Sequence, residues 1–288
     1  MTGAGRGLGR AYARLLAARG ASVVVNDLGG SMDGEGTDAG PARDVAAEIC
    51  AAGGDAIADD NDIATAEGAA ALVGAAVEHF GRIDILINNA GIIRWAGFPE
   101  ADDDNLAQHL AVHVAGSFHT TRAAWPHLVE QGYGRIVMTT STGLLGLPAN
   151  LSYATAKGGV LGMMRSLATA GVDHGITVNA IAPAATTRMA GEGSQAPPMP
   201  PEQVAPMVAC LAHETCPVTG EVYVAGAGRF SRLFLATTSG YVHEGADLTI
   251  EDVVAHWGAI NDETGYDVPA DLVAWSSTFL QHLGGGAI

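Results

Sequence analysis

The chain has 288 residues, of which 48% are hydrophobic, and a mean hydropathy of +0.20, which suits one large α/β domain with an appendage. Its formal net charge of −17 disfavours nucleic acid and anionic membrane surfaces as partners, and it shows neither a signal-peptide pattern nor an apolar run of about 18 residues. The cysteines, Cys50, Cys210 and Cys216, lack metal-ligand spacing, which indicates reduced thiols in a cytoplasmic protein without a metal site.

A glycine-rich turn opens the chain. The segment Thr2-Gly3-Ala4-Gly5-Arg6-Gly7-Leu8-Gly9 runs directly into a stretch whose apolar residues share one helical face. Backbone N–H groups at the start of such a helix bind anions, so the turn predicts a phosphate site. A buried-strand pattern follows at residues 22–26 and ends in Asp27, about 20 residues after the glycines, where a carboxylate binds the ribose of a dinucleotide.

The charge of Asp27 favours NAD over NADP, because a carboxylate repels a 2′-phosphate. Arg6 argues in the opposite direction, since a cation in the glycine turn could meet that phosphate, unless the arginine is simply solvated. The sequence therefore favours NAD and keeps NADP as the alternative.

No strand precedes the turn, although the strand that feeds it should lie in the middle of the sheet, between the strands near 22–26 and 83–88. Its three or four buried side chains would contribute about 5 to 10 kcal/mol, comparable with the net stability of a typical domain. We therefore expect a misassigned start at Met1. A chain extended upstream by roughly six to ten residues should be more stable and bind NAD more tightly.

Strand and helix patterns then alternate, which predicts a Rossmann-type doubly wound parallel sheet whose first strand is missing. The expected helices cover about 41–52, 65–80, 104–130, 152–172 and 201–213, and the expected strands cover 55–58, 83–88, 134–140, 175–181 and 221–225. Two segments interrupt this alternation and are predicted to be loops: one at 28–40 beside the adenosine site, and a Pro-rich one at 191–201 at the substrate site. The pattern changes after residue 235, so we expect a dinucleotide-binding domain at 1–235 and an extension at 236–288, with a capped helix starting at Thr249 and a frayed glycine tail at 284–286.

The residues that suggest catalysis lie in the middle of the chain. Tyr153 and Lys157 are four apart and share a helical face, so the ammonium is expected to lower the pKa of the phenol from about 10. Such a phenol can act as a general acid or base on an alcohol and ketone pair. Ser141 follows an apolar strand at the sheet edge where ligands bind, and it is preferred to Thr140 as the hydroxyl that orients the substrate oxygen.

These patterns together resemble the short-chain dehydrogenase/reductase family over residues 2 to about 230. The matching pieces are the glycine turn, Asp62-Ile63, Asn88-Asn89-Ala90-Gly91, Ser141, Tyr153-x-x-x-Lys157 and Asn179-Ala180-Ile181-Ala182-Pro183. The resemblance implies the following roles for cofactor binding: Gly3, Arg6, Gly7, Leu8 and Gly9 near the phosphates; Asp27 at the adenosine ribose; Asp62 and Ile63 at the adenine; Asn89, Ala90 and Gly91 near the cofactor ribose; and Tyr153 and Lys157 at the nicotinamide ribose and the substrate. His113 stands where many members have an asparagine, and it is expected to serve as a proton relay.

Finer features resemble the branch that contains the (3R)-hydroxyacyl-CoA dehydrogenase unit of multifunctional enzyme type 2 and its stand-alone bacterial relatives, which act in fatty acid metabolism. These features include the loop after Asp27, the run from Val112 to Phe118 and the segment from Ala184 to Met189. The resemblance implies an NAD-linked oxidation of a 3-hydroxyacyl-CoA by a homodimer or homotetramer, paired through the helices around 106–129 and 153–169. Two alternatives stay open: an NADPH-dependent 3-oxoacyl-thioester reductase, and a truncated, non-catalytic binding protein on the same fold.

Overall fold

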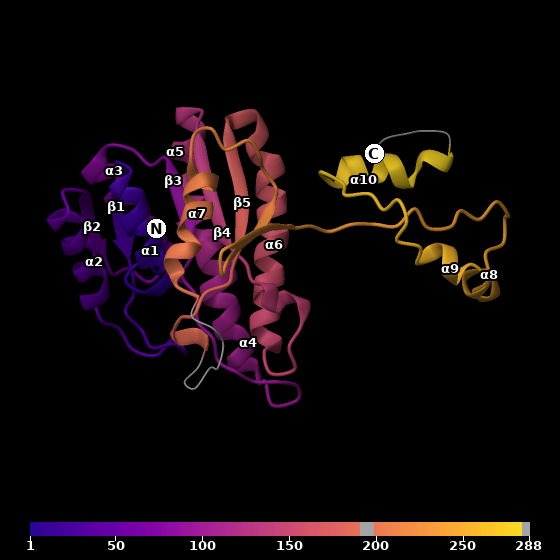
Figure 1. Cartoon of the computed structure of the whole chain (residues 1–288), viewed down its shortest axis with the longest axis horizontal. Coiled ribbons are helices and arrows are strands. Elements are labelled where there is room, and N and C mark those ends of the chain that lie inside the picture. The colour runs from indigo at the N-terminus through magenta and orange to yellow at the C-terminus, as the bar shows by residue number, and fades with distance from the viewer. Residues whose placement is uncertain (191–198, 284–288) are drawn as a thin grey trace. The chain divides into compact units, whose positions relative to one another are not determined.

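The computed structural model describes residues 1–190 and 199–283 (Figure 1). The chain divides into two compact units, Met1–Arg232 and Leu233–Ile288, close to the boundary after residue 235 that the sequence suggests. Most of the expected substrate loop at 191–201, and the glycine tail at 284–286, lie outside the described residues.

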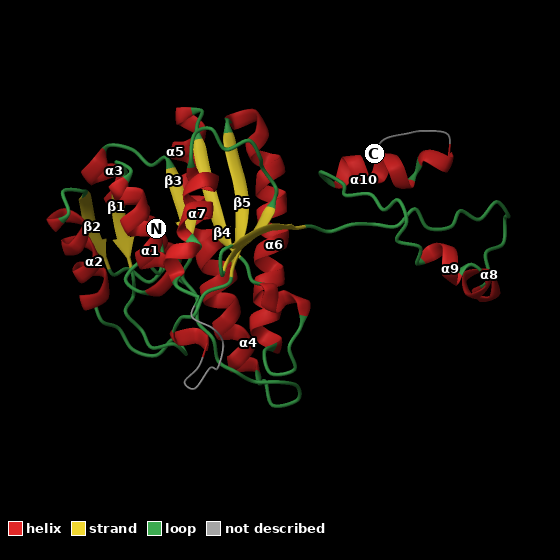
Figure 2. Cartoon of the chain, in the orientation of Figure 1, coloured by secondary structure: helices red, strands yellow, loops and turns green. Residues whose placement is uncertain are grey.

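The first unit alternates strands and helices (Figure 2). Its strands are β1 (Ser22–Asn26), β2 (Asp55–Asp59), β3 (Ile85–Asn88), β4 (Gly134–Thr139), β5 (Ile176–Pro183), β6 (Val222–Gly226) and β7 (Arg229–Leu233). Its helices are α1 (Gly7–Ala18), α2 (Gly40–Ala51), α3 (Ala66–Phe80), α4 (Asp103–His109), α5 (Gly116–Gln131), α6 (Leu151–Gly171) and α7 (Ala205–Ala212). Short 3-10 turns occupy Thr142–Leu145, Val172–His174, Arg188–Ala190 and Pro201–Gln203.

The predicted doubly wound α/β fold is confirmed. Strands β3, β4, β5 and β6 pair in parallel in that order, and β1 pairs in parallel with β2. Helices α1, α2 and α7 cover one face and α3, α5 and α6 cover the other, so the strands are buried on both sides. Every residue of β4 is buried, including the polar Arg135 and Thr139 on either side of its apolar centre at 136–138.

The described strands form two sheets, one of two strands and one of five, which meet at the start of the chain. Met1 and Thr2 lie between β1 and β3: the Asn26 N–H donates to the Met1 carbonyl at 3.0 Å, and the Thr2 N–H donates to the Ile87 carbonyl at 3.0 Å. The segment before the glycine turn therefore occupies the position between these strands that the sequence predicts for it.

Three features differ from the predicted elements. The helix expected at 104–130 is interrupted by a π-helical segment, Leu110–Ala115, which hydrophobic periodicity cannot reveal because the apolar face continues through it. Strand β7 was not predicted; it follows β6 after a two-residue turn in which Ala227 and Gly228 both have positive φ, the geometry of a tight hairpin. Helix α10 in the second unit was also not predicted.

The second unit contains α8 (Ile250–Ala255), α9 (Trp257–Ile260), α10 (Leu272–Phe279) and a 3-10 turn at Gln281–Leu283. The predicted start at Thr249 is confirmed, because its side chain accepts from the Asp252 N–H while the Asp252 carboxylate accepts from the Thr249 N–H. Among the described residues, no helix is both long and apolar enough to cross a membrane. The cytoplasmic location expected from the cysteines stays a prediction.

Candidate active site

A pocket of about 690 Å³ lies at the carboxyl ends of β1, β3, β4 and β5, where open α/β sheets bind ligands. It brings together nearly all the residues singled out from the sequence. The lining includes Gly3, Arg6, Gly7, Leu8, Asp27, Asp62, Ile63, Asn89, Ala90, Gly91, His113, Ser141, Tyr153 and Lys157. Gly9 does not line the pocket and instead packs beneath it.

The glycine turn is fixed to the end of β3 by side chains from both sides. The Thr2 hydroxyl accepts from the Asn89 and Ala90 N–H groups, each at 3.0 Å, and the Asn89 side-chain amide donates to the Gly3 carbonyl at 3.0 Å. Gly3 and Gly7 have φ values of 61° and 49°, which side chains rarely tolerate. Asn89 therefore holds the glycine turn in place, whereas the sequence suggested only that it lies near the cofactor ribose.

Gly9 has no room for a side chain. A Cβ at this position would lie 2.1 Å from the Gly3 carbonyl oxygen and 2.7 Å from the Asn89 side-chain nitrogen. We expect Gly9→Ala to displace the turn, to lower the thermal midpoint and to weaken NADH binding at least about tenfold, because an overpacked contact costs roughly 1 to 3 kcal/mol.

The matched control for that change is Gly74→Ala in α3, where a Cβ would meet nothing within 4 Å. This replacement should keep NADH affinity and raise stability by up to about 1 kcal/mol, since alanine favours a helix interior. Calorimetry and NADH titration measure both. An unchanged affinity in Gly9→Ala would show that the contact does not position the turn.

The end of the pocket where the sequence predicts the adenosine contains Asp27, whose carboxylate accepts from the Gly5 N–H at 2.9 Å and from the Gly29 N–H at 2.8 Å. These bonds join the glycine turn to the loop after β1 and leave lone pairs for ribose hydroxyls. The Asp62 carboxylate accepts from the Ala64 N–H at 2.9 Å, and the adjacent Ile63 is buried.

The inner end contains Ser141, Tyr153 and Lys157. The Ser141 hydroxyl accepts from the Gly143 N–H at 3.0 Å, and Ser141 Oγ and Tyr153 Cε1 both lie 3.2 Å from where a Cβ of Gly143 would be, so the serine lies beside the phenol ring. Thr140 is completely buried, and its hydroxyl donates to the Lys157 carbonyl at 3.0 Å. Ser141, and not Thr140, therefore lies beside the phenol.

Lys157 is also buried, and its ammonium donates to the Thr139 carbonyl at 2.7 Å and lies 5.5 Å from the centre of the Tyr153 ring. The expected lowering of the Tyr153 pKa is wrong for this structure. Burial raises the pKa of Tyr153, and the Ser141 hydrogen bond only partly opposes it. Burial likewise lowers the pKa of Lys157 from 10.5 to about 7, so desolvation acts on both groups more strongly than their mutual attraction.

The lowered pKa of Lys157 predicts a pH-dependent stability. Between pH 7 and 10.5 the unfolded chain keeps a proton at Lys157 that the folded chain has lost, so the free energy of unfolding should rise with pH across this window. Below pH 7 both states are protonated and this contribution is flat. Urea unfolding should show that rise in the unmodified protein and a smaller one in Lys157→Met; parallel curves would contradict the shift.

His113 lies in the π-helical segment, buried against the active-site tyrosine. Its Nε2 is 2.9 Å from the Ile92 carbonyl oxygen, and its Nδ1 has no hydrogen-bond partner among the described residues. The ring packs edge-to-face with Tyr153, with centres 5.5 Å apart. Burial, and then the charge of Lys157, hold the pKa of His113 well below its ordinary value, so the ring is neutral. A Cβ at Gly91 would lie 2.5 Å from this ring, which explains the glycine there.

Sequence reasoning assigned no role to several residues in or next to the pocket. His109 lies behind the lining, stacked on His113 with ring centres 5.9 Å apart, and is buried with Nδ1 bonded to the Asn105 carbonyl at 2.7 Å. Trp95 and Leu147 form an apolar part of the lining, and Arg188 reaches in from the loop after β5. The spacing of His109 four residues before His113 was a visible signal, whereas Trp95, Leu147 and Arg188 lie in loops whose approach depends on the fold.

Comparisons with known proteins agree with this geometry. The family model described as short chain dehydrogenase matches residues 1–197. A Mycobacterium tuberculosis protein named as a short-chain type dehydrogenase/reductase is 43% identical over 92% of this chain and 94% of its own. Peroxisomal multifunctional enzyme type 2 of Mus musculus is 41% identical over 94% of this chain, which spans 37% of that larger protein.

Comparison with solved structures also finds short-chain dehydrogenases. The crystal structure of a short chain dehydrogenase from Mycobacterium avium has a TM-score of 0.79 and 35% identity, covering 91% of this chain and 94% of that one. Full-length multifunctional enzyme type 2 from Drosophila melanogaster has a TM-score of 0.81 and 31% identity over 98% of this chain and 48% of that one. A matched family model, near full-length relatives and a pocket that gathers the expected residues agree: the chain belongs to the short-chain dehydrogenase family, oxidoreductases that use NAD(P) and act on CH–OH groups.

Proposed function

We propose that the protein is an NAD-dependent dehydrogenase that interconverts a 3-hydroxyacyl-CoA and its 3-oxoacyl thioester. The observation that carries the reaction type is the Tyr153 phenol beside Ser141, with the Lys157 ammonium 5.5 Å from the centre of its ring, at the inner end of the pocket. The substrate class is supported by the relatives, which include peroxisomal multifunctional enzymes and peroxisomal hydratase-dehydrogenase-epimerases at 38 to 41% identity.

In the oxidative direction, Tyr153 takes the proton of the C3 hydroxyl as general base, and the Ser141 hydroxyl donates to the oxygen that becomes the carbonyl. When bound, NAD supplies the acceptor for the hydride that leaves C3. Burial alone lowers the pKa of Lys157 to about 7, but a phenolate formed at Tyr153 favours the protonated lysine, whose charge then stabilises the phenolate most effectively in a site screened from water. His113 receives a proposed relay role through its unpartnered Nδ1, next to the tyrosine.

The proposal of NAD rests on Asp27. Its carboxylate is oriented by two backbone N–H groups and its side chain is only 12% exposed, so a 2′-phosphate there would be repelled by a charge of the same sign. Arg6 favours the alternative, an NADPH-linked reductase running the same chemistry in reverse, because its guanidinium lies 3.8 Å from the Asp27 carboxylate. Since that arginine is already beside the acid, we infer that its charge balances Asp27 rather than selecting NADP.

The outer part of the pocket suits an acyl thioester. Trp95 and Leu147 contribute apolar surface to the lining and are 47% and 55% exposed. Their segments are joined by a parallel β-bridge between Ala96 and Asn150. Together they form an apolar wall beside Ser141 and Tyr153, suited to a hydrocarbon chain.

The test is a screen of alcohol oxidation and ketone reduction with both cofactors. The panel contains 3-hydroxyacyl-CoA thioesters of several chain lengths and both configurations, hydroxysteroids and simple secondary alcohols. We expect the highest kcat/KM for a 3-hydroxyacyl-CoA with NAD. A preference for steroids or simple alcohols would contradict the substrate class, and absence of any turnover would favour a non-catalytic binding protein.

The assembly expected from the sequence is a homodimer or homotetramer. The helices concerned, α4, α5 and α6, carry exposed apolar side chains such as Leu106, Phe118 and Leu151. Pairing of these faces with a second copy would bury them around a two-fold axis. Light scattering at micromolar concentration should give the mass of a dimer or tetramer, and a monomer would contradict this expectation.

A further inference from the structure

Two arginines reach the same point of the pocket from opposite sides. Arg6 comes from the glycine turn before α1, and Arg188 comes from the loop after β5. Each guanidinium donates to the Gly30 carbonyl at 3.2 Å. The Arg188 bond joins loops 158 residues apart in sequence, one after β1 and one after β5, and so spans the pocket where the two sheets meet.

The partners available to this pair leave much of its hydrogen-bonding capacity unused. Gly30 offers one neutral carbonyl to two cations, and the Asp27 carboxylate, 3.8 Å from Arg6, already accepts from two backbone N–H groups. Within residues 1–190 and 199–283, the Arg6 Nε is buried without a hydrogen-bond partner. An arginine offers five donors, so this cluster is suited to an anion with several acceptor oxygens.

The surrounding charges agree with an anionic ligand. The chain has 14 Lys and Arg residues against 31 Asp and Glu residues, yet the pocket is lined by Arg6, Lys157 and Arg188 against only Asp27 and Asp62. The proximity of Arg6 also opposes the charge of Arg188: burial first, and then the Arg6 guanidinium, lower the pKa of Arg188. A bound anion would relieve this repulsion.

The position of Arg188 indicates which part of a ligand it meets. A Cβ at Gly7 would lie 3.6 Å from Thr187, so the loop that carries Arg188 lies directly opposite the first residue of α1. The N–H groups of that helix start form the phosphate-binding side of the pocket. A phosphate held by the turn would therefore have Arg188 on its other side.

We propose that Arg6 and Arg188 form a two-arginine clamp for the diphosphate of the dinucleotide, with Arg188 closing over the phosphates from the side opposite the glycine turn. The clamp rests on the proposed cofactor site. It assigns a binding role to Arg188, and it gives Arg6 a role that does not require a 2′-phosphate. Guanidinium groups suit this role because their planar fork binds two phosphate oxygens at once.

The test compares the binding of NADH, ADP, adenosine and NADPH to Arg188→Ala, Arg188→Lys and the unmodified protein. Arg188→Ala should weaken the binding of NADH and ADP at least about tenfold and change the affinity for adenosine by no more than about twofold, since only the first two ligands carry a diphosphate. Arg188→Lys should have NADH and ADP affinities between those of Arg188→Ala and the unmodified protein, because lysine keeps the positive charge and lacks the planar guanidinium. The dependence of NADH affinity on salt should also become shallower in Arg188→Ala.

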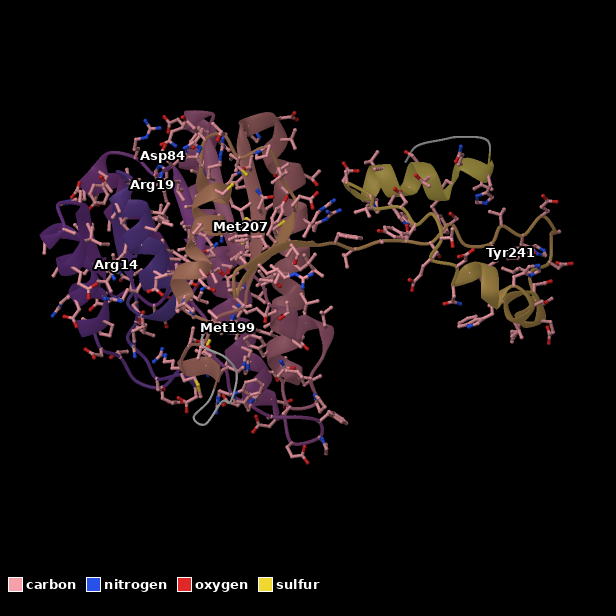
Figure 3. All side chains as sticks on the ribbon, in the orientation of Figure 1. Arg14, Arg19, Asp84, Met199, Met207 and Tyr241 are labelled. Atoms are coloured by element: carbon pink, nitrogen blue, oxygen red, sulfur yellow. The ribbon has the colours of Figure 1, made fainter. Side chains whose placement is uncertain are left out.

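Arg14→Ala is the matched control, because it removes a cation from the same region of the fold. Arg14, labelled in Figure 3, belongs to α1 and is not among the described residues that line the pocket. Its side chain is 54% exposed and lies 3.9 Å from Glu48. The Arg14→Ala variant should bind every ligand as tightly as the unmodified protein does, and thermal midpoints should show that all variants fold.

Each other outcome has a distinct meaning. Equal weakening of ADP and adenosine in Arg188→Ala, or no weakening of either, would overturn the clamp. A loss confined to NADPH would place a 2′-phosphate at the arginines and overturn the diphosphate assignment. If the unmodified protein bound neither NADH nor ADP, the cofactor site itself would be wrong, whereas intact binding with no thioester turnover would overturn only the proposed substrate.

Discussion

Turnover falls by about two to four orders of magnitude when Tyr153 is replaced by phenylalanine, whereas NADH affinity stays within about twofold. The ring and its packing against His113 remain, and only the group that exchanges a proton with the substrate is lost. Burial raises the pKa of Tyr153, so in the unmodified enzyme alcohol oxidation should also accelerate toward alkaline pH, where more of the phenol is ionised. Initial rates over a pH series and NADH titration measure both effects.

Two further variants make the Tyr153 result specific. Tyr223→Phe makes the same chemical change in β6, on a half-buried tyrosine outside the pocket lining, and should keep full activity. Lys157→Ala should impair both turnover and NADH binding, because its ammonium lies 5.5 Å from the centre of the Tyr153 ring and lines the pocket proposed to hold the cofactor. Most of the activity surviving in Tyr153→Phe would mean that another group exchanges the proton.

Replacing Asp27 with alanine brings the affinities for NAD and NADP close to each other. In the unmodified protein we expect NAD to bind at least about tenfold more tightly than NADP. The carboxylate is the acidic group beside Arg6, at 3.8 Å, so its removal leaves that cation free to meet a 2′-phosphate. Dissociation constants for NADH and NADPH give the ratio directly. Equal affinities in the unmodified protein would contradict the assignment of Asp27 to the ribose.

The loss of Asp27 also removes the acceptor for the Gly5 and Gly29 N–H groups, so a change in loop structure has to be separated from a change in charge. Asp27→Asn keeps one acceptor oxygen and removes the charge; it should shift the preference in the same direction with less loss of stability. Asp55→Ala removes an exposed carboxylate from β2, outside the pocket lining, and should leave the cofactor ratio unchanged.

Much of the fold was predictable because its signals are local. Apolar runs that end in polar residues, such as the one before Asp27 and the one before Asn88, identify strands buried on both faces, and the glycine turn identifies the first helix. The pocket residues followed, since the carboxyl ends of parallel strands meet at one edge of the sheet. The position between β1 and β3 was likewise predictable from their two-sided apolar pattern.

The remainder depends on three-dimensional packing. The π-helical segment at His113 adds one residue to a turn without changing its composition, so periodicity does not show it. The raised pKa of Tyr153 reflects burial, which the four-residue spacing to Lys157 does not encode. Arg188 reaches the Gly30 carbonyl, to which Arg6 also donates, only because two loops 158 residues apart in sequence come together at one pocket. Gly9 appeared to be a pocket residue in the sequence, and its role is packing against Gly3.

The most direct test of the account is the initial rate of NADH formation from a 3-hydroxyacyl-CoA, measured for the unmodified protein and for Tyr153→Phe with saturating NAD. We predict sustained NADH formation and stoichiometric 3-oxoacyl-CoA in the first, and a rate lower by about two to four orders of magnitude in the second. No NADH formation from any chain length or configuration, in a protein that binds NADH and keeps its fold, would contradict the proposed function.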